Sequence, residues 1–177
     1  MKGIIIYGTV YGSTKRYAQK LSQLTGWEVM SYDRVKSLSG YDAVVHLGGL
    51  YAGGIKGLKT TVKNLPDTAK LIVVTVGLAD PDSPENCRNL QTALERQLPE
   101  NILERTQSFH LRGAIDYEKL HLSHKMMMAL LIRSIKAKPS EQWSDEDRMI
   151  VQTYNQKVDF VNFEGLRVIT EAMRQIL

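Results

Sequence analysis

The sequence predicts an α/β fold built on a doubly wound, five-stranded parallel sheet. Residues 3–7, 43–47 and 71–76 are almost continuous apolar runs, as expected for strands that helices cover on both faces. Residues 28–32 are a weaker run, which indicates a strand nearer an edge, and residues 108–112 are a candidate fifth strand. Helical patterns separate these runs, and regular alternation of strand and helix is typical of a parallel sheet.

Four helices are expected around this sheet. Residues 14–24 place apolar side chains on one face at helical spacing. Residues 56–64 form a short helix that ends before Pro66, because proline disfavours a helical residue in front of it. Residues 83–98 begin with Ser83 as N-cap and Pro84 at the first helical position, and a last helix starts near Asn162.

Composition favours a single domain spanning residues 1–177, of ordinary globular character. The one cysteine, Cys87, cannot form an intramolecular disulfide, and no signal-peptide pattern precedes the first strand, which together favour a cytoplasmic location. The net charge of +4 is modest. Because zinc-finger and RNA-binding motifs are absent from the sequence, we expect neither a nucleic-acid partner nor a bound metal.

Residues 8–14 join the first strand to the first helix and read Gly-Thr-Val-Tyr-Gly-Ser-Thr. Backbone N–H groups at a helix N-terminus bind anions, and the hydroxyls of Thr9, Ser13 and Thr14 add donors. A P-loop would need a lysine here, and a dinucleotide-binding loop would need three glycines. Asp33 lies about twenty residues further on, where the ribose-binding acid of a dinucleotide site would lie. Because the three glycines are missing, it is interpreted as an ordinary loop residue. A terminal phosphate monoester fits this loop best.

Two further loops follow strands at the same edge of the sheet. The third strand runs into Gly48-Gly49-Leu50-Tyr51-Ala52-Gly53, and this concentration of glycine beside one tyrosine predicts a flat ligand close to the backbone. The fourth strand runs into Gly77-Leu78-Ala79-Asp80, which contains no aromatic residue. One face of the ligand would then be open or covered by aliphatic side chains.

The first of these loops resembles the FMN-phosphate loop of flavodoxins, in the pattern Thr9-x-Tyr11-Gly12-Ser13-Thr14, and the second resembles their Tyr-Ala-Gly flavin loop. The resemblance implies a flavodoxin-like fold, non-covalent FMN and electron transfer through it. It assigns no catalytic residue. The cofactor-binding residues that it implies are Thr9, Val10, Tyr11, Gly12, Ser13, Thr14, Gly48, Gly49, Leu50, Tyr51, Ala52, Gly53, Gly77, Leu78, Ala79 and Asp80.

A helical insertion, residues 116–157, follows the fifth strand. An apolar stripe and several basic side chains suggest either a helix lying on an anionic membrane, a Met-rich face for a flat ligand, or a helix packed on the core. The stripe comprises Tyr117, Leu120, His124, Met127, Leu131 and Ile135. Membrane contact through residues 117–138 would place the protein peripherally at the inner face of the membrane.

Around this insertion, the pattern Phe109, Gly113-Ala114, Tyr117 and Lys125-Met126-Met127 resembles the menaquinone-dependent protoporphyrinogen dehydrogenase family, which is similar to long-chain flavodoxins. That resemblance implies oxidation of a porphyrinogen with a quinone acceptor, in heme biosynthesis. Two alternatives remain open. The chain could carry electrons between protein partners, or it could be an interaction module that has lost the flavin.

Overall fold

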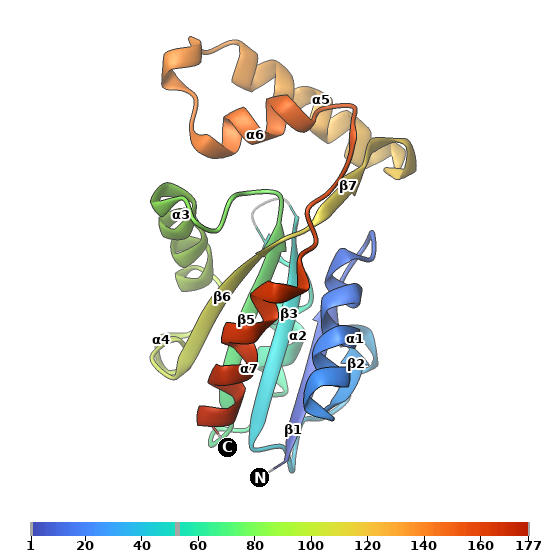
Figure 1. Ribbon diagram of the computed structural model, residues 1–177. Helices are drawn as coiled ribbons and strands as arrows, with labels where there is room; N and C mark the ends of the chain where they lie inside the picture. The colour runs from blue at the N-terminus through green and yellow to red at the C-terminus, as the bar shows by residue number, and fades with distance from the viewer. Residues whose placement is uncertain (1, 52–53, 177) are drawn as a thin grey trace.

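The computed structural model describes residues 2–51 and 54–176. Five parallel strands form the main sheet in the order β2-β1-β3-β5-β6, and the short strand β4 pairs antiparallel with the end of β3 (Figure 1). This order confirms the flavodoxin-like fold class. The strands are β1 (Gly3–Gly8), β2 (Glu28–Ser31), β3 (Ala43–Tyr51), β4 (Gly54–Ile55), β5 (Lys70–Gly77) and β6 (Thr106–Arg112).

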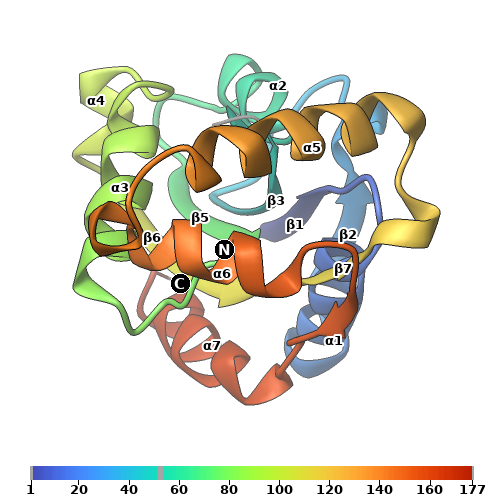
Figure 2. The same ribbon diagram turned by 90° about the horizontal axis from the view of Figure 1, so that it is seen from above.

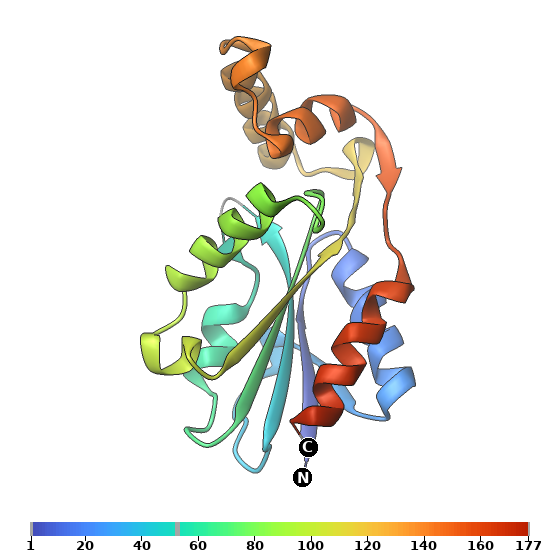
Figure 3. The same ribbon diagram turned by 60° about the vertical axis from the view of Figure 1, so that its left-hand side comes forward.

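Helices cover both faces of the sheet, which explains the continuous apolar runs in its central strands (Figure 3). The helices α1 (Ser13–Thr25) and α7 (Leu166–Gln175) pack on one face. The other face is covered by α2 (Leu58–Lys63), α3 (Pro84–Glu95) and α4 (Glu100–Leu103).

Several boundaries differ from the sequence prediction. The helix expected at 56–64 begins only at Leu58, because Gly57 adopts a left-handed conformation with φ of 82° in front of it. The helix expected at 83–98 ends at Glu95. The last helix follows a 3₁₀ turn at Phe163–Gly165, and a similar turn at Tyr32–Arg34 follows β2.

The insertion leaves and rejoins the domain through a two-stranded antiparallel ribbon of β7 (Ala114–Asp116) and β8 (Lys157–Asp159). Between these strands lie 3₁₀ turns at Tyr117–Lys119 and Ser140–Gln142 and the helices α5 (Leu122–Lys136) and α6 (Asp145–Thr153). Figure 2 shows α5 and α6 lying side by side across the end of the sheet. The insertion therefore forms a roof over the carboxyl ends of the strands.

The single helical stripe expected from Tyr117 to Ile135 is wrong. Tyr117 lies in a 3₁₀ turn, where the Asp116 carboxylate accepts a hydrogen bond from the Glu118 N–H at 3.2 Å. Tyr117 is buried, but the chain turns before α5 starts at Leu122. Only part of the expected stripe thus belongs to one helix.

His46 in β3 is a buried polar residue that joins the sheet to α2 and to the loop before it. Its Nδ1 lies 2.8 Å from the Thr61 hydroxyl, and its Nε2 lies 3.0 Å from the Lys56 carbonyl oxygen. The carbonyl can only accept, so Nε2 carries the proton and Nδ1 accepts from Thr61. Burial lowers the pKa of His46 to about 4, and the imidazole is therefore neutral in the folded protein.

We expect His46 to make the protein less stable as the pH falls below its ordinary pKa. Between pH values of about 6.5 and 4, the unfolded chain binds a proton that folded His46 does not. The loss from pH 7 to pH 5 should be about 2 kcal/mol, measured by urea unfolding. His46→Gln should remove this part of the pH dependence, because glutamine does not titrate. His110 is still present and titrates in both proteins, so its contribution is the same in each.

If both proteins lose the same stability over this range, His46 is not the titrating group.

Candidate functional site

A cavity of about 220 Å³ lies between the carboxyl edge of the sheet and the insertion. All three loops singled out in the sequence contribute to its wall: the first through Tyr11 and Ser13, the second through Leu50 and Tyr51, and the third through residues 77–79. The cavity lies where strand order reverses between β1 and β3, the place where ligands bind in doubly wound sheets.

The loop between β1 and α1 is shaped to receive an anion. Gly12 has a φ of 97°, a left-handed conformation that favours glycine, and its N–H donates to the Thr9 hydroxyl at 2.9 Å. The Thr14 side chain is fully buried, and its hydroxyl has no hydrogen-bond partner among the described residues. A buried hydroxyl without a partner is costly, so this loop fits a ligand such as a phosphate group.

The Tyr51 side chain lies against this loop. Its hydroxyl accepts a hydrogen bond from the Val10 N–H at 3.2 Å, which occupies a donor that an anion could use. A Cβ on Gly49 would lie 2.7 Å from the Tyr51 ring and 3.3 Å from the Thr14 hydroxyl oxygen. Glycine at position 49 therefore lets the ring lie against the strand, and an anion entering the loop must displace the Tyr51 hydroxyl.

Two glycines attributed to ligand contact have an internal reason in the structure. A Cβ on Gly48 would lie 2.2 Å from a methyl group of Ile55, and a Cβ on Gly77 would lie 2.8 Å from a methyl group of Leu50. These glycines thus make room for neighbouring side chains of the protein itself. Whether the backbone at either glycine also comes close to a ligand stays a prediction, and Gly77 lies in the wall of the cavity.

The third loop contributes Leu78 and Ala79 to the cavity but not Asp80. The Asp80 carboxylate accepts a hydrogen bond from the Asp82 N–H at 3.0 Å, and its carbonyl accepts from the Asn86 side chain at 3.0 Å. Asp80 therefore shapes the turn before α3. Two further predicted site residues, Ala52 and Gly53, lie outside the described residues.

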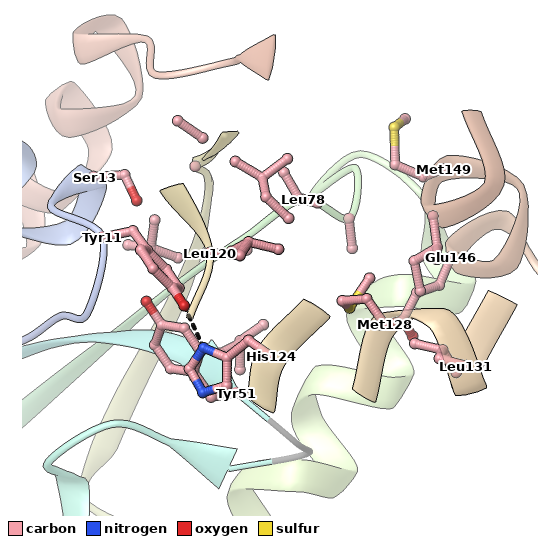
Figure 4. A pocket seen from close by; sticks show the side chains of 18 of the residues that line it. Tyr11, Ser13, Tyr51, Leu78, Leu120, His124, Met128, Leu131, Glu146 and Met149 are labelled. Carbon is pink, nitrogen blue, oxygen red and sulfur yellow. Dashed lines mark hydrogen bonds between the residues drawn. The ribbon is translucent and has the colours of Figure 1, made fainter. Parts of the chain in front are cut away.

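The insertion closes the other side of the cavity with aliphatic and methionine side chains. Met127, Met128 and Leu131 of α5 line it, together with Met149 of α6 (Figure 4). The cavity beside the third loop is therefore lined by aliphatic and methionine side chains, and the cover of a bound ligand's face stays a prediction.

His124 joins the start of this roof to the loop between β1 and α1. Its Nδ1 forms a hydrogen bond with the Tyr11 hydroxyl, and the His121 N–H donates to the same oxygen at 3.3 Å (Figure 4). The His124 ring also lies 6.3 Å from the Tyr51 ring, between centroids, and nearly parallel to it. His124 was expected only as part of an apolar stripe, whereas it joins two of the predicted site residues.

Glu146 of α6 brings a carboxyl group into the cavity wall. Partial burial, with the nearby Asp147 and Glu85 carboxylates, raises the pKa of Glu146 above its usual value. A carboxyl group of raised pKa keeps its proton to a higher pH than an ordinary glutamic acid and can exchange it with a bound molecule. Glu146 is therefore one group of the lining that can transfer a proton.

His110 and Arg112, at the end of β6, have structural partners. His110 Nδ1 lies 2.6 Å from the Thr75 hydroxyl oxygen. The Arg112 guanidinium lies 3.7 Å from the centre of the Phe160 ring and donates to the Met149 sulfur at 3.4 Å. These contacts indicate a structural role for both residues.

We expect the Tyr11 hydroxyl to hold α5 over the cavity. Tyr11→Phe removes the partner of His124 and of the His121 N–H, a loss of about 1 kcal/mol. Amide hydrogen exchange within residues 125–136 should then become about five-fold faster, since local opening becomes easier. Tyr154→Phe in the same insertion is the matched control, and equal exchange in both variants would show that Tyr11 does not hold the helix.

Within the described part of the chain, no helix has both the length and the apolar composition needed to cross a membrane. Nor do residues 2–51 and 54–176 bring together three or more side chains of His, Cys, Asp or Glu as a potential metal site.

Comparison with known proteins identifies the family. No curated protein sequence matches the chain. Similar solved structures include a Bacteroides eggerthii protein (12% identity, 61% of this chain and 86% of that one, TM-score 0.47). Another is a Lactobacillus acidophilus flavoprotein in complex with FMN (12% identity, 63% of this chain and 92% of that one, TM-score 0.44). A third is a flavodoxin from the domain Archaea (14% identity, 64% of this chain and 84% of that one, TM-score 0.43). A flavodoxin domain model matches residues 4–142, most of the sequence, and the chain therefore belongs to the flavodoxin domain family.

Proposed function

We propose that this protein binds FMN non-covalently and transfers electrons between the flavin and a flat, lipophilic substrate held under the insertion. The observation that carries the proposal is the buried, unpartnered hydroxyl of Thr14 at an anion-binding loop that opens onto the cavity. Membership of the flavodoxin domain family supports FMN as the ligand of that loop.

The chain's own residues fit this cofactor. The N–H groups of Val10 and Tyr11 and the hydroxyls of Ser13 and Thr14 would hold the phosphate. Leu50 and Tyr51, with Leu78 and Ala79 of the third loop, would border the ring. When bound, FMN would supply the ability to accept and return an electron pair, while the protein orients the ring and excludes water.

Within this function, we favour oxidation of a porphyrinogen-like substrate with a quinone as acceptor. Each step would remove an electron pair and two protons from the substrate, and the quinone would take up the same number and become a hydroquinone. His124 and Glu146 lie in the cavity wall, where they can give and receive these protons. The methionine side chains of the roof adapt to bulky flat molecules.

The alternatives are less well supported by the geometry. An electron carrier exchanges electrons with protein partners through an accessible flavin edge, whereas here α5 and α6 cover the carboxyl end of the sheet. A module without flavin would have no use for the unpartnered Thr14 hydroxyl. Neither alternative accounts for an apolar cavity between the loops and the roof.

We expect Thr14→Val to weaken FMN binding by about 10- to 100-fold, because a hydrogen bond to a charged phosphate oxygen is lost from a buried position. Thr14→Ser keeps the hydroxyl and should bind within a few-fold of the parent protein. Quenching of FMN fluorescence during titration measures both. If Thr14→Val binds FMN as tightly as the parent, Thr14 does not contact the cofactor.

The roof can be removed cleanly, because Asp116 and Lys157 face each other across the β7–β8 ribbon. Replacing residues 117–156 with Asn-Gly should give a two-residue hairpin turn. We expect this variant to keep flavin absorbance with added FMN but to reduce menaquinone analogues no faster than free FMN. The parent protein should reduce them when protoporphyrinogen is supplied.

Equal turnover with and without the roof would contradict its role in the reaction. Loss of the flavin from the variant would instead make the insertion part of the cofactor site.

A further inference from the structure

We propose that the outer face of α5 docks on an anionic lipid surface, and that a lipophilic substrate enters the cavity from that surface. The docking is inferred only from the residues on the surface of α5, whereas the entry of substrate rests on the function proposed above. The argument comes from exposure, charge and the continuity of α5 with the cavity.

Large apolar side chains form an exposed stripe on α5. Leu122, Met126 and Leu130 recur at every fourth residue, on one side of the helix, and are 74%, 60% and 68% exposed. Met127 and Leu131 extend the stripe toward the cavity. Side chains of this size are normally buried, and a contiguous group of them marks an interaction surface.

Positive charge lies beside this stripe. α5 contains no acidic residue, and among the described residues Lys125, Arg133 and Lys136 form no ion pair with a carboxylate. Helical spacing puts Lys125 and Lys136 along one flank of the stripe and Arg133 at its end. Apolar side chains with lysine and arginine beside them are typical of a helix that lies in the interface of an anionic membrane.

Two of the three acidic residues of α6 have partners within the protein, and the third, Glu146, lies in the wall of the cavity. Asp147 caps α6 through the Ser144 N–H and lies 3.5 Å from Lys138. Asp145 accepts a hydrogen bond from the Ser83 hydroxyl at 2.7 Å. These carboxylates therefore have partners within the protein and do not neutralise the basic flank of α5.

A second copy of the chain fits this face less well. Two copies of α5 that pack antiparallel about a two-fold axis would bring the same basic flank close to itself, and like charges at an interface oppose association. An anionic lipid surface offers negative charge to the flank and an apolar phase to the stripe at the same time.

The stripe is also continuous with the cavity. Met127 and Leu131 line the cavity and remain partly exposed at the surface. One helix thus has apolar side chains on the lipid side and on the cavity side. A quinone or another lipophilic molecule can pass along these side chains without crossing water.

Co-flotation of the FMN-loaded protein with vesicles tests the docking. We expect binding to vesicles of phosphatidylcholine with phosphatidylglycerol, at least ten-fold weaker binding to pure phosphatidylcholine, and loss of binding in high salt. Leu122→Ser with Leu130→Ser should weaken binding at least ten-fold. The matched control is Leu24→Ser with Val168→Ser, at two exposed apolar sites on other helices, and should bind as the parent does.

Flavin absorbance and far-ultraviolet circular dichroism confirm that each variant is folded and loaded. Equal binding by both double variants, or no binding to anionic vesicles, overturns the proposal. A dimer in solution that Leu122→Ser with Leu130→Ser converts to a monomer would assign the face to a second copy instead. Vesicle binding requires no turnover, so its result is separate from a failure of the redox function.

Discussion

The position of the roof depends on the hydroxyl of Tyr17. This hydroxyl donates to the Arg112 carbonyl at 2.8 Å and accepts from the Asn162 N–H at 2.9 Å, so it joins the points where the insertion leaves and rejoins the domain. Tyr17 lies on α1, the helix that follows the anion loop, and its ring is buried in the core. The core of the domain thereby fixes where α5 and α6 lie relative to the proposed cofactor loops.

The fold could be predicted because its central strands are covered on both faces. Burial on both faces imposes continuous apolar runs, and these runs located β1, β3 and β5 along the chain. The ribbon of β7 and β8 left no such pattern, since each strand has three partly buried or exposed residues. One available signal was not used: Ser144 and Asp147 have the spacing of a capping box and mark the start of α6.

The site was predictable where it depends on local chain chemistry. A hydroxyl-rich turn between a strand and a helix indicated an anion site, and Thr14 proved to be buried without a partner. The roof was not predictable, because the bond between Tyr11 and His124 joins residues that are 113 positions apart. Gly48 and Gly77 show the same limit, since only the folded chain reveals that Ile55 and Leu50 fill the space beside them.

A roof of this kind changes what a flavin could do beneath it. Aliphatic and methionine side chains exclude water, and in such surroundings a separated charge is costly. Transfer of an electron pair together with its protons avoids that charge, whereas exchange of single electrons with a distant protein does not. His124 and Glu146 at the cavity wall provide titratable groups for such protons. The apolar roof and these two side chains therefore fit the proposed chemistry, in which a lipophilic molecule would be oxidised or reduced in direct contact with the ring.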